Sequence, residues 1–150
     1  MNVEQIMSKP VIKISEDASL QEAATLMLEN GIGCLPVVGV RGKIVGVVTE
    51  SSFTAKEKGV PFSTFRAPQL FGRWLSEAGV EKIYAEARTT RVGDVMSAPA
   101  VTVEEHESIN RAVELMLEHD INRIPVVKDG EPVGVVARHD MLRLLAASEL

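Results

Sequence analysis

Pairs of short apolar runs joined by a polar turn occur twice along the chain. In the second half, residues 121–127 and 133–136 are rich in valine and isoleucine and flank a turn at residues 128–131. In the first half, residues 32–38 and 45–48 flank a glycine-containing turn in the same way. β-Branched residues favour strands, and a short turn between two such runs favours a hairpin. The pattern predicts two hairpins, each ending in polar residues where a helix should start.

An amphipathic helix is predicted before each hairpin. In the first half, Ser19 and Glu22 have the spacing of a capping box, and Gly31 suits the helix end because glycine adopts the left-handed conformation without strain. In the second half, Ser108 is the predicted cap, but Arg111 stands where a glutamate would complete the box. No glycine follows this second helix, so we expect its end to be less stable. Apolar residues of the first helix recur at helical spacing, namely Leu20, Ala23, Ala24, Met27 and Leu28.

The two halves are repeats of one another. Residues 3–38 align without a gap with residues 92–127, and the second strands of the hairpins align after a turn that is one residue longer in the first half. The predicted organisation is therefore a first repeat at residues 2–53, an insertion at residues 54–91 and a second repeat at residues 92–147. Internal repetition of this kind indicates one fold used twice.

Each repeat is predicted to begin with a short strand, at residues 10–14 and 99–103, and to end with a helix after the hairpin. One repeat cannot bury both faces of such a small sheet, whereas two copies packed sheet to sheet can. The expected fold is α/β (mixed α+β), with two β-α-β-β-α repeats related by a pseudo-twofold axis. A cleft between the repeats is the expected place for a ligand.

The insertion concentrates the aromatic residues of the chain. Its apolar residues have helical spacing, so a structured helical segment is expected rather than a flexible linker. Two roles stay open: a helical cover packed on the repeats, or a surface for a dimer or another partner built on aromatic anchors. The aromatic residues are Phe53, Phe62, Phe65, Phe71, Trp74 and Tyr84.

Composition narrows the function. The chain has 150 residues, of which 45% are hydrophobic and 25% charged, and its net charge of −5 argues against a nucleic-acid binder. The first twenty residues contain charges and no apolar core of a signal peptide, and no apolar run approaches the length of a membrane span. We therefore expect a cytoplasmic protein that contacts neither nucleic acid nor membrane.

Sequence motifs for catalysis or metal binding are weak. Residues 31–36 resemble a dinucleotide fingerprint but are one residue short, and they follow a helix instead of preceding one. The single cysteine, Cys34, aligns with Arg123 of the other repeat, so a packing role is expected rather than a nucleophile. No carboxylates pair as acid and base, so no enzyme is expected. The histidines lack metal-ligand spacing, so no metal site is expected; they are His106, His119 and His139.

Three segments of the second repeat, taken in register with the first, resemble a known family. They are residues 92–97 followed by Pro99, residues 122–127, and residues 134–136 leading to Asp140. In these features the chain resembles the tandem cystathionine-β-synthase domain, also called the CBS pair or Bateman module. The resemblance covers residues 2–53 and 91–147 and leaves out most of the insertion.

The resemblance implies a regulatory function. Members bind adenosine derivatives such as AMP, ADP, ATP or S-adenosylmethionine, with one potential site per repeat, and commonly form homodimers. No cofactor is required; an adenine nucleotide is the expected regulatory ligand. Because no effector domain accompanies the repeats, the signal is expected to reach an unknown partner protein in trans. The alternative is a structural dimerisation or scaffold module whose ligand sites have decayed.

The resemblance also implies site residues. After the last strand the family pattern places a Thr or Ser near phosphate and an Asp on the ribose hydroxyls, at a helix start that suits anions. The second repeat has Asp140 but Ala137 in the Thr place, and the first has Thr49 but Ser52 in the Asp place. Arg123 is the expected phosphate contact. A helix cap for Asp140 and a solvated charge for Arg123 are the alternatives. The remaining candidates for nucleotide binding are Ile12, Lys13, Ile14, Pro36, Val101, Thr102, Val103, Pro125, Val126, Arg138 and His139.

Overall fold

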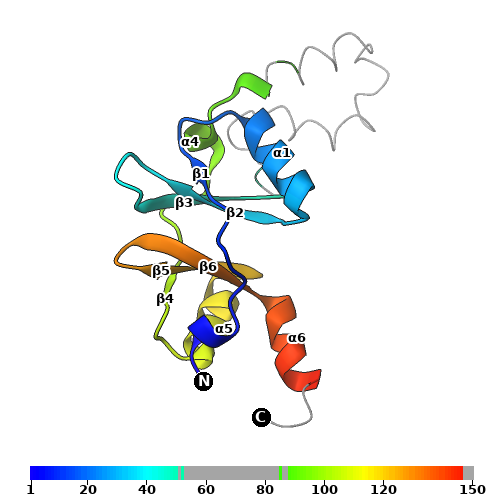
Figure 1. Ribbon diagram of the computed structural model, residues 1–150, viewed down its shortest axis with the longest axis vertical. Coiled ribbons are helices and arrows are strands. Elements are labelled where there is room, and N and C mark those ends of the chain that lie inside the picture. Colours follow the sequence, from blue (N-terminus) through cyan, green and yellow to red (C-terminus); the bar gives the residue numbers. More distant parts are fainter. Residues whose placement is uncertain (51, 53–84, 86–87, 147–150) are drawn as a thin grey trace.

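Two three-stranded sheets face each other in the computed structural model, which describes residues 1–50, 52, 85 and 88–146. Helices lie on the outer sides of the pair (Figure 1). This arrangement confirms the predicted mixed α+β fold of two repeats. In chain order the elements are η1 (Val3–Gln5), β1 (Ile14–Ser15), α1 (Leu20–Asn30), β2 (Cys34–Val38), β3 (Ile44–Thr49), α4 (Val92–Val95), β4 (Val103–Glu104), α5 (Ile109–His119), β5 (Arg123–Lys128), β6 (Glu131–Ala137) and α6 (Arg138–Ala146).

Both sheets have the same topology. The strand order is β1-β2-β3 in the first repeat and β4-β5-β6 in the second. The outer strand runs parallel to the middle one, with Ile14 opposite Val37 and Val103 opposite Val126, while β2–β3 and β5–β6 are the predicted antiparallel hairpins. All four of these side chains are buried, so the register places the apolar residues of each short outer strand in the core.

The predicted strands at residues 10–14 and 99–103 are mostly wrong. Only Ile14–Ser15 and Val103–Glu104 pair in a ladder, and the residues before them belong to no strand. The reason is their path between the sheets. Ser8 bridges to Val135 of the second repeat, and Ser97 bridges to Val47 of the first. Each entering segment therefore starts on the sheet of the other repeat and reaches its own sheet only at the end.

This exchange extends to the hydrophobic core. Val3 is fully buried in the cluster formed by the second repeat, and Val92 is fully buried in the cluster formed by the first. Their backbone N–H groups bond across as well, from Val3 to the Glu107 carbonyl at 2.9 Å and from Val92 to the Ala18 carbonyl at 2.7 Å. In Figure 1 the N-terminal segment accordingly lies beside α5. Neither core is complete without residues from the opposite repeat.

Two equivalent glycines make room for the crossing segments. A Cβ atom on Gly134 would lie 2.6 Å from the sulfur of Met7 and 3.0 Å from the Ser8 carbonyl oxygen. A Cβ atom on Gly46 would lie 2.5 Å from the sulfur of Met96. Real Cβ atoms do not approach other atoms so closely. The carbonyl groups of Ser8 and Ser97 are part of these contacts, and a backbone group cannot move away by changing rotamer as a side chain can. Glycine is thus required where each segment passes over a strand.

The helix caps follow the sequence closely. The capping box at α1 is confirmed, with Ser19 accepting from the Glu22 N–H at 3.1 Å and Glu22 accepting from the Ser19 N–H at 3.1 Å. Gly31 ends this helix at φ 61°, and Ser108 caps α5 by accepting from the Arg111 N–H. At the end of α5, Asp120 adopts the same left-handed conformation at φ 51°. A residue with a side chain is strained there, although Asp tolerates this region better than most.

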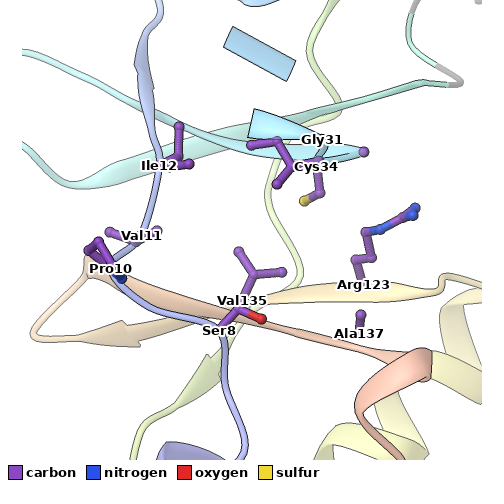
Figure 2. Close-up of a pocket in the computed structure, with 11 residues that line it drawn as sticks. Ser8, Pro10, Val11, Ile12, Gly31, Cys34, Arg123, Val135 and Ala137 are labelled. Atoms are coloured by element: carbon purple, nitrogen blue, oxygen red, sulfur yellow. The ribbon is translucent and has the colours of Figure 1, made fainter. Parts of the chain in front are cut away.

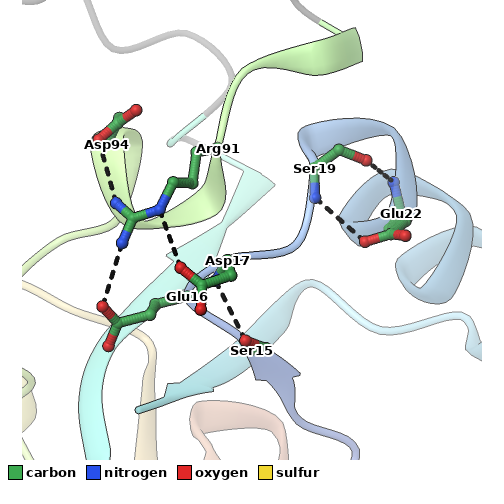
Figure 3. A network of polar contacts seen from close by, with 7 residues as sticks. All are labelled: Ser15, Glu16, Asp17, Ser19, Glu22, Arg91 and Asp94. Carbon is green, nitrogen blue, oxygen red and sulfur yellow. Dashed lines mark hydrogen bonds and ion pairs between the residues drawn. The ribbon is translucent and has the colours of Figure 1, made fainter. Parts of the chain in front are cut away.

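Arg91 fixes the chain where it enters the second repeat. Its guanidinium bonds to Glu16 and Asp17 at 3.1 Å each, on the link between β1 and α1, and to Asp94 at 3.4 Å (Figure 3). These carboxylates, Asp17 first, hold the pKa of Arg91 above its ordinary value. The segment before α4 is therefore held on the first repeat. The predicted helical insertion lies almost wholly outside the described residues, as does most of the helix predicted after the first hairpin.

Candidate functional site

Several cavities take their walls from both repeats, and two of these are equivalent to each other. The first, called cavity 1, encloses about 190 Å³ (Figure 2). Its walls come from the entering segment and the start of β2 in the first repeat, and from the end of β6 in the second. It is lined by Ser8, Pro10, Val11, Ile12, Gly31, Ile32, Gly33, Cys34, Arg123, Val135 and Ala137.

The second, called cavity 2, is larger and more polar. It encloses about 350 Å³ between the entering segment and the start of β5 in the second repeat and the end of β3 in the first. It is lined by Val47, Thr49, Glu50, Ser97, Pro99, Ala100, Val101, Asp120, Ile121, Asn122, Arg123 and Pro125.

The cavities are pseudosymmetric counterparts, and each is composite. Ile12 in cavity 1 corresponds to Val101 in cavity 2, and Ala137 corresponds to Thr49. Since every cavity takes its last-strand residues from the opposite repeat, neither belongs to one repeat alone. The hydroxyl of the first repeat, at Thr49, therefore shares cavity 2 with Arg123 of the second.

Arg123 lies between the cavities and lines both of them. In Figure 2 its side chain extends from β5 toward the first repeat. Its Cζ atom is 2.9 Å from the place where a Cβ atom on Gly33 would be, and the Glu50 Oε1 atom is also 2.9 Å from that place. Glycine at position 33 thus leaves space for a guanidinium and a carboxylate to converge from different repeats.

Cys34 occupies the position equivalent to Arg123 and faces cavity 1. Burial raises the pKa of its thiol to about 11, and the charge of Arg123 only partly opposes this. A thiol with such a pKa is almost entirely protonated at neutral pH, and the thiolate is the nucleophilic form. The geometry therefore favours the packing role expected for Cys34 from the sequence.

Asp140 has one partner at the end of β6 and one in its own helix, α6. The side chain is only 4% exposed, its Oδ2 atom accepts from the Ala137 N–H at 2.7 Å, and its Oδ1 atom contacts the guanidinium of Arg143. In the first repeat, Ser52 makes the equivalent bond, accepting from the Thr49 N–H at 2.9 Å. Asp140 lines neither cavity 1 nor cavity 2 but a third cavity, of about 520 Å³, which Ser8 and Lys9 of the first repeat also line.

The other predicted site residues separate into three groups. Cavity 2 brings together Thr49, Val101, Arg123 and Pro125, whereas cavity 1 contains only Ile12 and Arg123. Four are buried in the hydrophobic cores: Ile14, Pro36, Val103 and Val126. Four line neither cavity: the exposed Lys13, Arg138 and His139, and the half-buried Thr102.

Sequence reasoning missed several residues that line the cavities. Ser8 and Ser97 are aligned with each other in the two repeats, and this identity could have indicated a shared role. Each bridges to the sheet of the opposite repeat and lines a cavity. Glu50 and Asp120 carried no signal, because their place in cavity 2 depends on how the two repeats are packed together.

Among the residues that the structure describes, no three His, Cys, Asp or Glu side chains gather closely enough to hold a metal ion. No helix in this described part of the chain combines the length and apolar character needed to cross a membrane.

Comparisons with known proteins agree on one family. The CBS domain model matches residues 3–57 and 92–147. The structure of the CBS domain of a CBS domain containing membrane protein from Sphaerobacter thermophilus is 38% identical, with a TM-score of 0.76 over 96% of this chain and 87% of that one. The CBS domain pair of protein MJ0100, in complex with 5′-methylthioadenosine and S-adenosyl-L-methionine, is 25% identical, with a TM-score of 0.69 over 97% of this chain and 95% of that one.

A longer relative matches as well. The uncharacterized protein MJ1404 of Methanocaldococcus jannaschii is 34% identical over 144 residues, which cover 96% of this chain. The match covers only 32% of that relative, so the repeats here correspond to about a third of its length.

The bonds of Asp140 predict a stabilising role for this residue. Asp140→Ala should lower the free energy of unfolding by about 1–3 kcal/mol, because it leaves the half-buried Ala137 N–H without its acceptor. Asp140→Ser should recover part of the loss, since Ser52 makes the same bond with a hydroxyl. Urea unfolding measures both, and Arg143→Ala isolates the contribution of the ion pair. Equal stability of Asp140→Ala and the parent would contradict this role.

Proposed function

Because the chain belongs to the CBS domain family, we propose that it is a non-catalytic regulatory module that binds an adenosine derivative in cavity 2. The observation that carries the proposal is the meeting of Thr49, Val101 and Arg123 in one cavity between the repeats. The complex of the MJ0100 CBS domain pair with two adenosine derivatives supports this ligand class.

Size favours cavity 2 over cavity 1. Pockets for ligands of this size usually enclose roughly 300–1,000 Å³. Cavity 2, at about 350 Å³, falls within that range, whereas cavity 1, at about 190 Å³, does not. Of these two cavities, volume therefore favours cavity 2 for a nucleoside.

The walls of cavity 2 supply groups for each part of a nucleoside. Ala100 and Val101 lie outside the strand ladder, so their peptide groups suit the donors and acceptors on the edge of an adenine ring. Pro125 and Val101 add apolar surface against the ring faces. Thr49 and Arg123 stand at the polar end, where sugar hydroxyls and the 5′ substituent would lie.

A ligand in a composite cavity contacts both repeats at once. Binding therefore favours the arrangement of the repeats in which both walls contact the ligand. The shift toward this arrangement is set by how much more tightly the ligand binds to it than to other arrangements. We propose that a partner protein detects this change in trans. The chain spans about a third of MJ1404, so the activity of any longer protein containing these repeats is likewise a proposal.

The equivalence of the cavities provides a matched test of the ligand site. Val101→Phe should fill cavity 2 and raise the Kd for adenosine derivatives about tenfold or more, since 1.4 kcal/mol corresponds to a factor of about ten. Ile12→Phe makes the equivalent change in cavity 1 and should leave the Kd unchanged. Isothermal calorimetry with adenosine, AMP and S-adenosylmethionine measures both.

The reverse result would place the ligand in cavity 1, near Asp140. If neither the parent nor the variants bind any of the three compounds at millimolar concentration, the proposed function is wrong and the scaffold alternative is favoured.

The scaffold alternative and the regulatory proposal share one feature, a homodimer. Leu28 on α1 is 84% exposed, and Leu117 on α5 is 72% exposed. They occupy equivalent positions in the repeats, and exposed apolar side chains that gather into one patch mark an interaction surface. We propose that these two helix faces pair with a second copy of the chain.

Light scattering after gel filtration tests the dimer. The chain should elute at about twice 16.3 kDa, and Leu28→Glu with Leu117→Glu should give monomer, because the charges would be buried in the interface. Val40→Glu is the control, because Val40 is 97% exposed and lies in the turn of the first hairpin, away from both helices. A monomeric parent at high micromolar concentration would exclude this arrangement.

A further inference from the structure

The charges around cavity 2 do not match those expected for a phosphate site. Three charged side chains line it: the carboxylates of Glu50 and Asp120 and the guanidinium of Arg123. Their formal sum is negative. Among the described residues, by contrast, Arg123 is the only charged one that lines cavity 1. The larger cavity is thus the one that repels an anion, even though it contains the basic residue expected to bind phosphate.

The position of Glu50 strengthens this effect. Its Oε1 atom and the Cζ atom of Arg123 each lie 2.9 Å from the same point, the place of a Cβ atom on Gly33. The two charged groups can therefore be no farther apart than the sum of these distances. At such a separation the carboxylate opposes much of the positive potential that a phosphate would feel from Arg123.

We propose that cavity 2 selects adenosine derivatives whose 5′ substituent is uncharged or carries positive charge, and that Glu50 is the residue that disfavours phosphates there. The inference rests on the proposed function, since it names the class of ligand for the same cavity. A thioether or sulfonium substituent meets no repulsion from Glu50 and Asp120. A doubly or more highly charged phosphate has to compete with Glu50 for one guanidinium.

The size of the effect follows from the exposure of these groups. Glu50 and Asp120 lie at the solvent-facing rim, where screening reduces interactions between charges. The affinities for uncharged and phosphorylated adenosine derivatives should therefore differ several-fold and not a thousandfold. The difference should grow as the salt concentration falls.

Calorimetry with four probes tests the inference: adenosine, S-adenosylmethionine, AMP and ATP, without magnesium. In the parent protein, adenosine and S-adenosylmethionine should bind more tightly than AMP, and AMP more tightly than ATP. Glu50→Gln should raise the ratio of AMP affinity to adenosine affinity by up to about fivefold at low salt, because exposed charge pairs are worth up to ~1 kcal/mol. Glu131→Gln is the control, since it removes the same charge at the start of β6 and away from cavity 2.

The outcomes separate the inference from the function on which it rests. If no probe binds, both are overturned. If ATP binds more tightly than adenosine to the parent, or if Glu50→Gln leaves the ratio of AMP to adenosine affinity unchanged, the charge selection is wrong while the adenosine site stands. If Glu131→Gln tightens AMP as much as Glu50→Gln does, net charge rather than Glu50 is responsible, which also overturns the assignment.

Discussion

The structure depends on the crossing of each entering segment over the sheet of the opposite repeat. Ser8 bonds to Val135 and Ser97 to Val47 before either segment reaches its own sheet. Beyond these bridges, Val3 and Val92 complete the cores of the repeats that they enter. Each hydrophobic core is therefore built from both repeats, and neither repeat buries its apolar surface without the other.

The same crossing creates the cavities. Because residues 100–102 run from the sheet of the first repeat to that of the second, they pass beside the end of β3 and leave a space lined by both. Thr49 and Arg123 meet there although the alignment assigns them to different repeats. Glu50 joins them from the end of the first hairpin, which places a carboxylate beside the guanidinium. The ligand class that we infer thus follows from the packing of the repeats.

Local features were predictable from sequence, and features that depend on the packing of the repeats were not. The capping box of Ser19 and Glu22 involves neighbours along the chain, and the hairpins follow from β-branched runs around a turn. The entering segments were wrongly predicted to be strands of their own repeat. Their first backbone partners lie in the other repeat, and the sequence of one repeat does not show this. Alignment likewise gives a position within a repeat but not the cavity that it faces, so the sequence did not show that Arg123 lines both cavities or that Thr49 shares cavity 2 with it.

The central claim is that the exchange makes the two repeats one cooperative unit, and hydrogen exchange of Gly134→Ala tests it most directly. The added methyl group would contact Met7 and the Ser8 carbonyl, which should cost about 1–3 kcal/mol. If the repeats unfold together, amides in β2 and β5 should lose the same free energy of protection. Loss of protection confined to β5, with β2 unchanged, would contradict the claim.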